Sequence, residues 1–386
     1  MSTIAQSPTE SFWDRLLYQI HLKRVVPVLG PGILTMRDDV TGEDVLLHQW
    51  LLPQLAERLD LPLDVPHTTL NLLMLQHLVR GGKRMALYDE LRMLLDEGCL
   101  RPGQALLDLA AIKDFQLYLT STFDPLPALA LAEERPGFSV ENDVLTFHPT
   151  EVRDLPRELK RPLVYHVMGQ INSYPDFAVW DEDHMEFICE MQNKAGELRK
   201  FFDTLKQRSL LLIGSPFTDW VVRFFLRVAR QSRLSERKGS ASDYLADDPL
   251  HIEESLVVYF DKIANTTSVI SLDPQLFVSE LKRRWQTKYG ASMKTSVDPE
   301  GRSEHFAPLR DLLAQLYSSE RDVIRIASDV GIPPSRLIND KAINIWDELL
   351  RECQRRSLIK KLMDVVSKEY PNQANELTVL SNPMLQ

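Results

Sequence analysis

Short apolar runs alternate with longer amphipathic segments through the first three quarters of the chain. The apolar runs are VVPVL at 25–29, FQLYLTST at 115–122, PLVYHVMG at 162–169, SLLLIG at 209–214 and SLVVYF at 255–260. Runs of this length, bounded by glycine, proline or polar residues, are typical of buried strands. The segments between them, and most of residues 43–110, repeat apolar residues at helical spacing. The pattern predicts an α/β fold, a Rossmann-like parallel sheet with helices on both faces.

The pattern changes after Trp285. Residues 286–304 are polar and without periodicity, which predicts a linker. Residues 305–380 carry four amphipathic helical segments, which predict an all-α helical bundle. The sequence therefore predicts three parts: a Rossmann-like domain over 1–285, a linker over 286–304 and a helical domain over 305–380.

Composition narrows the range of partners and compartments. The net charge of −10 argues against binding to nucleic acid or to an anionic membrane, since both need clustered basic surface. No apolar run approaches the ~18 residues that a membrane helix needs, and the N-terminus does not resemble a signal peptide. Three widely spaced cysteines form neither a disulfide framework nor a zinc site. These features predict a cytoplasmic protein.

One turn has the composition of a ligand-binding loop. Gly30, Pro31 and Gly32 directly follow the apolar run at 25–29. Glycines after a strand allow a phosphate or a ribose to approach the backbone closely. The third glycine of the usual dinucleotide fingerprint is missing, so a plain tight turn is the competing interpretation.

Three further stretches occur in a recognisable order. They are LTSTFD at 119–124, VYHVMG at 164–169 and LIGSPFTDW at 212–220. Together with VLGPGIL at 28–34, they resemble the sirtuin-like domain of bacterial anti-phage NAD-consuming effectors, over roughly residues 10–285. The resemblance implies a pocket for NAD or an ADP-ribose-like nucleotide. The residues that it places in this pocket are Gly30, Pro31, Gly32, Thr122, Asp124, Met168, Gly214, Ser215 and Asp219.

The sequence departs from that family at the two catalytic positions. Thr122 stands where the family has asparagine, and Met168 stands where it has histidine. Methionine offers a weak acceptor and no proton chemistry, and loss of a general base commonly removes ~10²–10⁴-fold in rate. His166 lies two residues before Met168 and would share its face in a strand, so it is a candidate replacement. His148, His184 and His251 lack the spacing of metal ligands, so no metal is expected.

The C-terminal segments carry a second resemblance. Gly331-Ile332-Pro333, Trp346 and Tyr370-Pro371 mark a helical pattern similar to the effector-associated domain of bacterial conflict systems, which resembles death folds. The resemblance implies a protein partner with a matching domain, or self-association into a homo-oligomer. The alternative is a helical cap on the sheet domain with Trp346 in its core.

Taken together, these patterns favour a degenerate sirtuin-like module of an anti-phage system. It would bind NAD or an ADP-ribose-like nucleotide as sensor or scaffold, while the C-terminal bundle recruits a partner. Two alternatives stay open: an active NAD hydrolase that uses Thr122, Asp124 and His166 in altered roles, and an interaction scaffold without nucleotide.

Overall fold

The computed structural model describes most of the N-terminal three quarters of the chain and separate parts of the remainder. The described residues are 8–38, 41–62, 69–171, 177–214, 219–236, 242–248, 250, 252, 254–260, 267–290, 309, 312–313, 316–317, 319–332, 345–346, 349–350, 353, 358–373 and 377. The chain divides into two compact units, Met1–Ala291 and Ser292–Gln386. Each unit is considered separately below.

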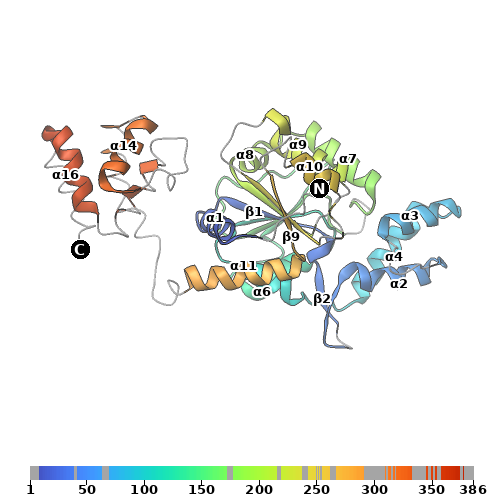
Figure 1. The fold of residues 1–386 in the computed structure, drawn as a ribbon. Coiled ribbons are helices and arrows are strands. Elements are labelled where there is room, and N and C mark those ends of the chain that lie inside the picture. The colour runs from blue at the N-terminus through green and yellow to red at the C-terminus, as the bar shows by residue number, and fades with distance from the viewer. Residues whose placement is uncertain are drawn as a thin grey trace. The chain divides into compact units, whose positions relative to one another are not determined.

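A seven-stranded sheet forms the centre of the first unit (Figure 1). All its pairings are parallel, and the strand order is β5-β6-β4-β1-β7-β8-β9. The strands are β1 (Val25–Leu29), β4 (Leu117–Thr120), β5 (Val144–Thr146), β6 (Leu163–His166), β7 (Ser209–Ile213), β8 (Asp243–Asp247) and β9 (Thr267–Ser271). A separate antiparallel pair joins β2 (Thr35–Arg37) to β3 (Asp44–Leu46).

Helices cover both faces of this sheet, because successive strand residues point to opposite sides. Val25 and Leu29 of β1 belong to one apolar core, whereas Val26 and Val28 belong to the other. The first core includes α1 (Glu10–His21), α2 (Leu47–Arg58), α3 (Leu70–Val79), α4 (Arg84–Glu97), α5 (Gln104–Ala110), α6 (Leu126–Glu134) and α11 (Pro274–Tyr289). The second includes α7 (Asp181–Asn193), α8 (Arg199–Gln207), α9 (Asp219–Arg230) and α10 (Glu254–Tyr259). The predicted fold class is confirmed.

The predicted strand at 255–260 is wrong, since these residues form helix α10. An apolar run of six residues fits a buried strand or one face of a short helix equally well. In this region β7 pairs with β8, which has the sequence DYLAD, and β8 pairs with β9, which has the sequence TSVIS. β8 does not form a continuous apolar run because aspartates stand at both of its ends. β9 does not form one because it contains half-exposed threonine and serine residues.

A buried ion pair explains how an aspartate begins the buried strand β8. Asp243 and Arg230 are 1% and 4% exposed. Arg230 Nε donates to Asp243 Oδ2 at 3.2 Å, and Asp243 Oδ1 accepts the Leu210 N–H at 2.9 Å. Arg230 Nη1 also donates to the carbonyls of Leu205 and Arg208. The pair thus joins the ends of α8 and α9 to the starts of β7 and β8.

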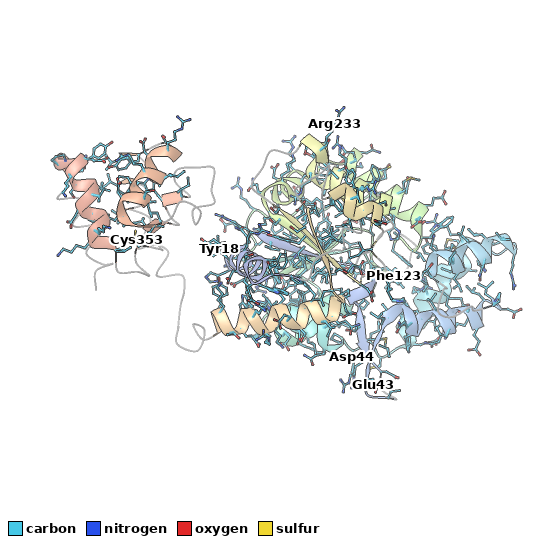
Figure 2. All side chains as sticks on the ribbon, in the orientation of Figure 1. Tyr18, Glu43, Asp44, Phe123, Arg233 and Cys353 are labelled. Carbon is cyan, nitrogen blue, oxygen red and sulfur yellow. The ribbon has the colours of Figure 1, made fainter. Side chains whose placement is uncertain are left out.

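The C-terminal unit has an apolar core of its own. It contains α14 (Glu320–Val330), α16 (Ile359–Glu369) and the short helix η6 (Pro371–Gln373). Trp346 and Cys353, the latter labelled in Figure 2, are fully buried in an apolar cluster of described residues from this unit. Gly331 ends α14 with φ +95°, and the Ile332 N–H returns to the Ala327 carbonyl at 2.8 Å.

The predicted linker and the predicted third helix of the C-terminal domain lie largely outside the described residues. Helix α11 continues to Tyr289, past residue 285, and residues 291–308 lie outside the described residues. Most of the predicted helix at 343–356 lies outside them as well, as do Pro333 and Pro334. Within the part of the chain that the structure describes, no helix has the length and apolar composition needed to cross a bilayer.

Candidate functional site

Two glycine turns meet at the carboxyl ends of β1 and β7. The Gly30 N–H donates to the Ile213 carbonyl at 3.0 Å, and the Gly32 N–H donates to the Gly214 carbonyl at 3.3 Å. A Cβ on Gly32 would lie 2.9 Å from Gly214 Cα. Gly214 has φ +65°, and a Cβ there would lie 2.6 Å from the Ile33 nitrogen. Glycine is required at both positions because the two turns pack backbone against backbone, whether or not a ligand is present.

Gly30 and Pro31 are less constrained. Gly30 has the extended conformation φ −117°, ψ −179°, which any residue adopts. Pro31 begins the 3₁₀ helix η1 (Pro31–Ile33), where its fixed φ and missing N–H suit the first turn. Pro31 also lines the cavity described below, so the turn contributes to the site through this side chain.

Gly32→Ala should lower the free energy of unfolding by about 1–3 kcal/mol, because the added methyl group overpacks the contact with Gly214. Gly196→Ala is the matched control, since a Cβ at Gly196 meets no atom within 4 Å. That control should change stability by about 0.5 kcal/mol or less. Urea denaturation measures both. Equal values for the two variants would show that the turns are not in close contact.

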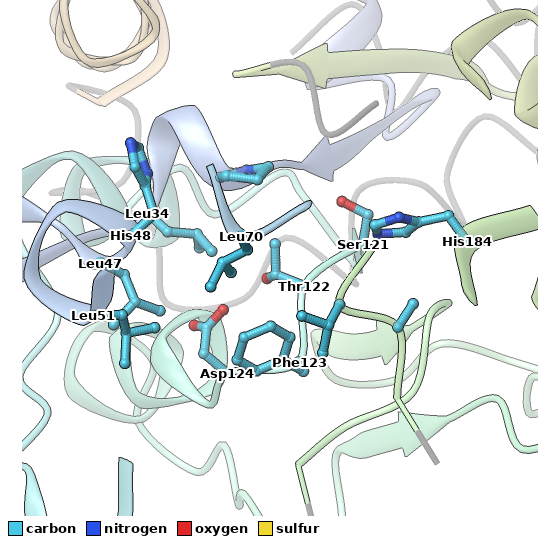
Figure 3. Close-up of a pocket in the computed structure, with 13 residues that line it drawn as sticks. Leu34, Leu47, His48, Leu51, Leu70, Ser121, Thr122, Phe123, Asp124 and His184 are labelled. Carbon is cyan, nitrogen blue, oxygen red and sulfur yellow. The ribbon is translucent and has the colours of Figure 1, made fainter. Parts of the chain in front are cut away.

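A small cavity lies beside these turns, at the ends of β1 and β4 (Figure 3). Its volume is about 70 Å³, roughly five times what one water molecule needs. Most of the lining is apolar, and the polar side chains come from the loop after β4 and from α2 and α7. The lining residues are Pro31, Leu34, Leu47, His48, Leu51, Leu70, Ser121, Thr122, Phe123, Asp124, Ala178, Val179 and His184.

Asp124 is the acidic side chain of this cavity. It is fully buried, and its Oδ1 accepts the Leu126 N–H at 3.0 Å. Its Oδ2 has no hydrogen-bond partner among the described residues. Burial raises the pKa of Asp124 to about 6, although the neighbouring Thr122 hydroxyl and the Leu126 N–H oppose the rise. A buried carboxylate with one oxygen unsatisfied is costly, so it indicates a site where a donor binds or a proton is exchanged.

Thr122 occupies the expected place in the loop, but its hydroxyl has a partner. Thr122 Oγ1 lies 2.9 Å from Thr120 Oγ1, and the Thr122 N–H donates to the same Thr120 oxygen at 3.3 Å. The adjacent Ser121 Oγ donates to the Leu29 carbonyl at 2.9 Å, which ties the end of β4 to β1. These contacts fix the backbone of the loop that carries Asp124.

His166 is placed beneath this loop and is not among the residues that line the cavity. It ends β6, is fully buried and pairs in register with Thr120. Its Nδ1 lies 3.0 Å from the Thr122 carbonyl, so Nδ1 carries the proton and donates it. Nε2 has no partner among the described residues, and burial lowers the pKa of the imidazole to about 4. His166 therefore holds the Thr122 backbone as a neutral ring.

Met168 does not share a face with His166. Strand β6 ends at His166, the chain turns at Gly169 with φ +78°, and strand alternation does not extend to residue 168. Met168 is fully buried in the core on the side of α7, α8 and α9, together with Tyr165 and Val167. The prediction that His166 shares a strand face with Met168, and so could replace the missing histidine there, is therefore wrong.

Two histidines that sequence reasoning did not assign to the site line the cavity. His48 comes from α2 and His184 from α7, which lie 136 positions apart in the sequence. Burial lowers the pKa of His184 to about 4, and the nearby Asp183 carboxylate opposes this. Neither residue belongs to a local motif, so only the folded chain brings them to the cavity that Asp124 lines.

The remaining predicted residues cannot be placed as side chains. Ser215 lies outside the described residues, and Asp219 is described only as the first residue of α9. Among the described residues, no group of three or more histidine, cysteine or acidic side chains is positioned to hold a metal ion.

Parallel α/β sheets commonly bind their ligands at the carboxyl ends of the strands, which is where this cavity lies. Comparison with protein families then finds a SIR2-like domain at residues 116–256. The match contains Thr122, Asp124 and His166, whereas the turn at Gly30 lies before it. No curated protein matches the chain. The SIR2-like domain implies a function related to NAD.

Proposed function

We propose that this chain is a SIR2-like module that binds NAD or an ADP-ribose-like nucleotide as a sensor or scaffold, with little or no turnover. The proposal rests on the unsatisfied carboxylate of Asp124. Its Oδ2 has no partner among the described residues, and it lines an apolar cavity at the strand ends. Ribose hydroxyl and carboxamide groups are donors that satisfy such an oxygen.

The cavity fits one part of a dinucleotide. Ligand pockets for whole small molecules usually measure about 300–1,000 Å³, and this cavity measures about 70 Å³. One ring-sized group with a donor suits its apolar lining and the Asp124 carboxylate. NAD, when bound, would supply the nicotinamide–ribose bond as the reactive group. The residues that would hold that end are Asp124, Thr122 and Phe123, with Pro31 on the opposite turn.

Weak turnover follows from what the neighbouring residues do. Thr122 is engaged with Thr120, and Met168 lies in the core on the side of α7, α8 and α9. His166 is fully buried, and its Nδ1–H donates a hydrogen bond to the Thr122 carbonyl. None of the three is placed to take a proton from a water molecule in the cavity, so binding without efficient cleavage is the expected behaviour.

Calorimetric titration of the full chain with NAD and with ADP-ribose tests the binding proposal. Asp124→Asn should weaken binding of at least one of them by about tenfold, because an amide at this position removes a charged acceptor. Asp203→Asn, an exposed position on α8, is the matched control and should bind like the wild type. Unchanged affinity in Asp124→Asn would contradict the assignment. Absence of binding in the wild type would favour a scaffold without nucleotide.

An active NAD hydrolase is the second candidate, and the pKa of Asp124 favours it. A carboxylate with a pKa near 6 is mostly ionised at pH 7.5 and accepts a proton more readily than an ordinary aspartate. In this case Asp124 Oδ2 would take the proton of a water molecule in the cavity. Release of nicotinamide that is lost in Asp124→Asn would support this candidate over a sensor.

We further propose that the C-terminal unit recruits a protein partner with a matching domain, within a bacterial anti-phage system. The resemblance of residues 305–380 to effector-associated domains supports this, and so does a core made of that unit's own residues. Protection of a bacterial host from phage infection tests the proposal. Protection that survives deletion of residues 292–386 would contradict it.

A further inference from the structure

The glycine turn beside the Asp124 cavity presents no unsatisfied backbone N–H to a ligand. Parallel α/β sheets often bind phosphate through free N–H groups at such a turn or at the N-terminus of the helix that follows. Here the Gly30 and Gly32 N–H groups donate to carbonyls at the end of β7 and just after it, and Pro31 has no N–H. The N–H groups of Ile33 and Leu34 donate to the Gly30 and Pro31 carbonyls, both at 3.3 Å. The turn is therefore satisfied within the protein.

The helix that follows β4 offers no free anion site either. Asp124 Oδ1 accepts the N–H of Leu126, the first residue of α6, at 3.0 Å. Pro125 and Pro127 stand on either side of Leu126, and neither has an N–H. A helix N-terminus favours a negative charge, and here the carboxylate of Asp124 already occupies that place. A phosphate of the ligand would have to displace this carboxylate to bind there.

The charge of the cavity also disfavours phosphate. Among the described residues that line it, only His48 and His184 can carry a positive charge, and burial lowers the pKa of His184 to about 4. Asp124, whose pKa burial raises to about 6, is still mostly ionised at pH 7.5. Its Oδ2 has no partner among the described residues. At this pH the carboxylate attracts a cation with hydrogen-bond donors and repels a phosphate dianion.

We propose that this site recognises its ligand as a nucleoside, through the nicotinamide riboside group alone, and that it does not bind phosphate. The oxidised nicotinamide ring is a cation, and its carboxamide and the ribose hydroxyls are donors that suit the Asp124 carboxylate. The affinity for NAD then comes from its nicotinamide riboside half. This inference rests on the proposed function, and of the two ligands named there it selects NAD over ADP-ribose.

Calorimetric titration of the full chain with nicotinamide riboside, nicotinamide mononucleotide and NAD tests this inference, since the three probes share one group and differ in phosphate. The riboside should bind at least as tightly as the other two. ADP-ribose, which lacks nicotinamide, should bind at least about tenfold more weakly than NAD. Asp124→Asn should weaken binding of the cationic riboside by about tenfold and binding of the mononucleotide by less. Asp203→Asn, at the exposed position on α8, is the matched control and should leave the ratio of the two affinities unchanged.

Tighter binding of the mononucleotide or of NAD than of the riboside would overturn the inference, because phosphate would then contribute to recognition. The proposed function would stand after that result, since a nucleotide would still bind. Binding of ADP-ribose as tight as that of NAD would overturn the selection of nicotinamide. An equal loss of affinity for the riboside and the mononucleotide in Asp124→Asn would contradict the role given to the charge of Asp124. Binding of none of the four ligands would contradict both this inference and the proposed function.

Discussion

Arg230→Leu should lower the free energy of unfolding by about 3–5 kcal/mol, because it leaves the buried Asp243 carboxylate without its counter-ion. Two buried carbonyls, of Leu205 and Arg208, also lose the donor that Arg230 provides. Since this pair joins two helices to two neighbouring strands, the loss should affect cooperative unfolding of the whole sheet. Urea denaturation followed by circular dichroism measures the change.

Two variants separate this effect from a general effect of removing an arginine. Arg283→Leu removes an exposed arginine of α11 that pairs with Glu280, and it should change stability little. The double variant Arg230→Leu/Asp243→Leu should recover part of the loss, because no buried charge is left uncompensated. If Arg230→Leu were as stable as the wild type, the buried ion pair would not hold these elements together.

Asp124→Asn should raise the free energy of unfolding by about 3 kcal/mol at pH 8. The pKa of this buried carboxyl rises from 3.8 to about 6 on folding, and each unit corresponds to about 1.4 kcal/mol. The raised pKa means that the folded state holds the proton more tightly than the unfolded state. The resulting cost is absent below pH 3.8, grows between about pH 3.8 and 6, and is complete above pH 6. Removing the charge removes this cost.

The pH dependence distinguishes this mechanism from a change in packing. The gain from Asp124→Asn should disappear near pH 4, where the wild-type carboxyl is protonated in both states. Asp203→Asn, at the exposed position on α8, should show no comparable gain. A stabilised variant that binds nucleotide more weakly would show that this residue is maintained for function at the expense of stability. An Asp124→Asn variant less stable than the wild type at pH 8 would contradict the account.

The central strands could be predicted from the sequence because their apolar runs are continuous and bounded by turns. β1, β4, β6 and β7 all lie within predicted strands. β8 could not be found in this way, since its first residue is an aspartate that is buried only through its pair with Arg230. The prediction of a strand at 255–260 is wrong because an apolar run of this length is compatible with both a strand and a short helix.

The site could be predicted in part. The sequence places Thr122 at the end of a predicted strand and Asp124 just after it, and the structure finds both in the cavity beyond the end of β4. It could not indicate that His48 and His184 join them, because helices distant in the sequence bring these residues together. Nor could it show that Met168 leaves the strand face, since that depends on where β6 ends. The resemblance to a sirtuin-like domain predicts the loop that carries the candidate site, whereas the walls of the cavity depend on tertiary packing.

The central claim is that the chain binds NAD without cleaving it. The most direct test measures free nicotinamide after overnight incubation of the full chain with NAD at pH 7.5. The same samples are first titrated by calorimetry to establish binding. The account predicts that NAD binds and that nicotinamide stays at the level of a protein-free control. Release of nicotinamide in proportion to the amount of protein would contradict it and would assign the chain to the NAD hydrolases.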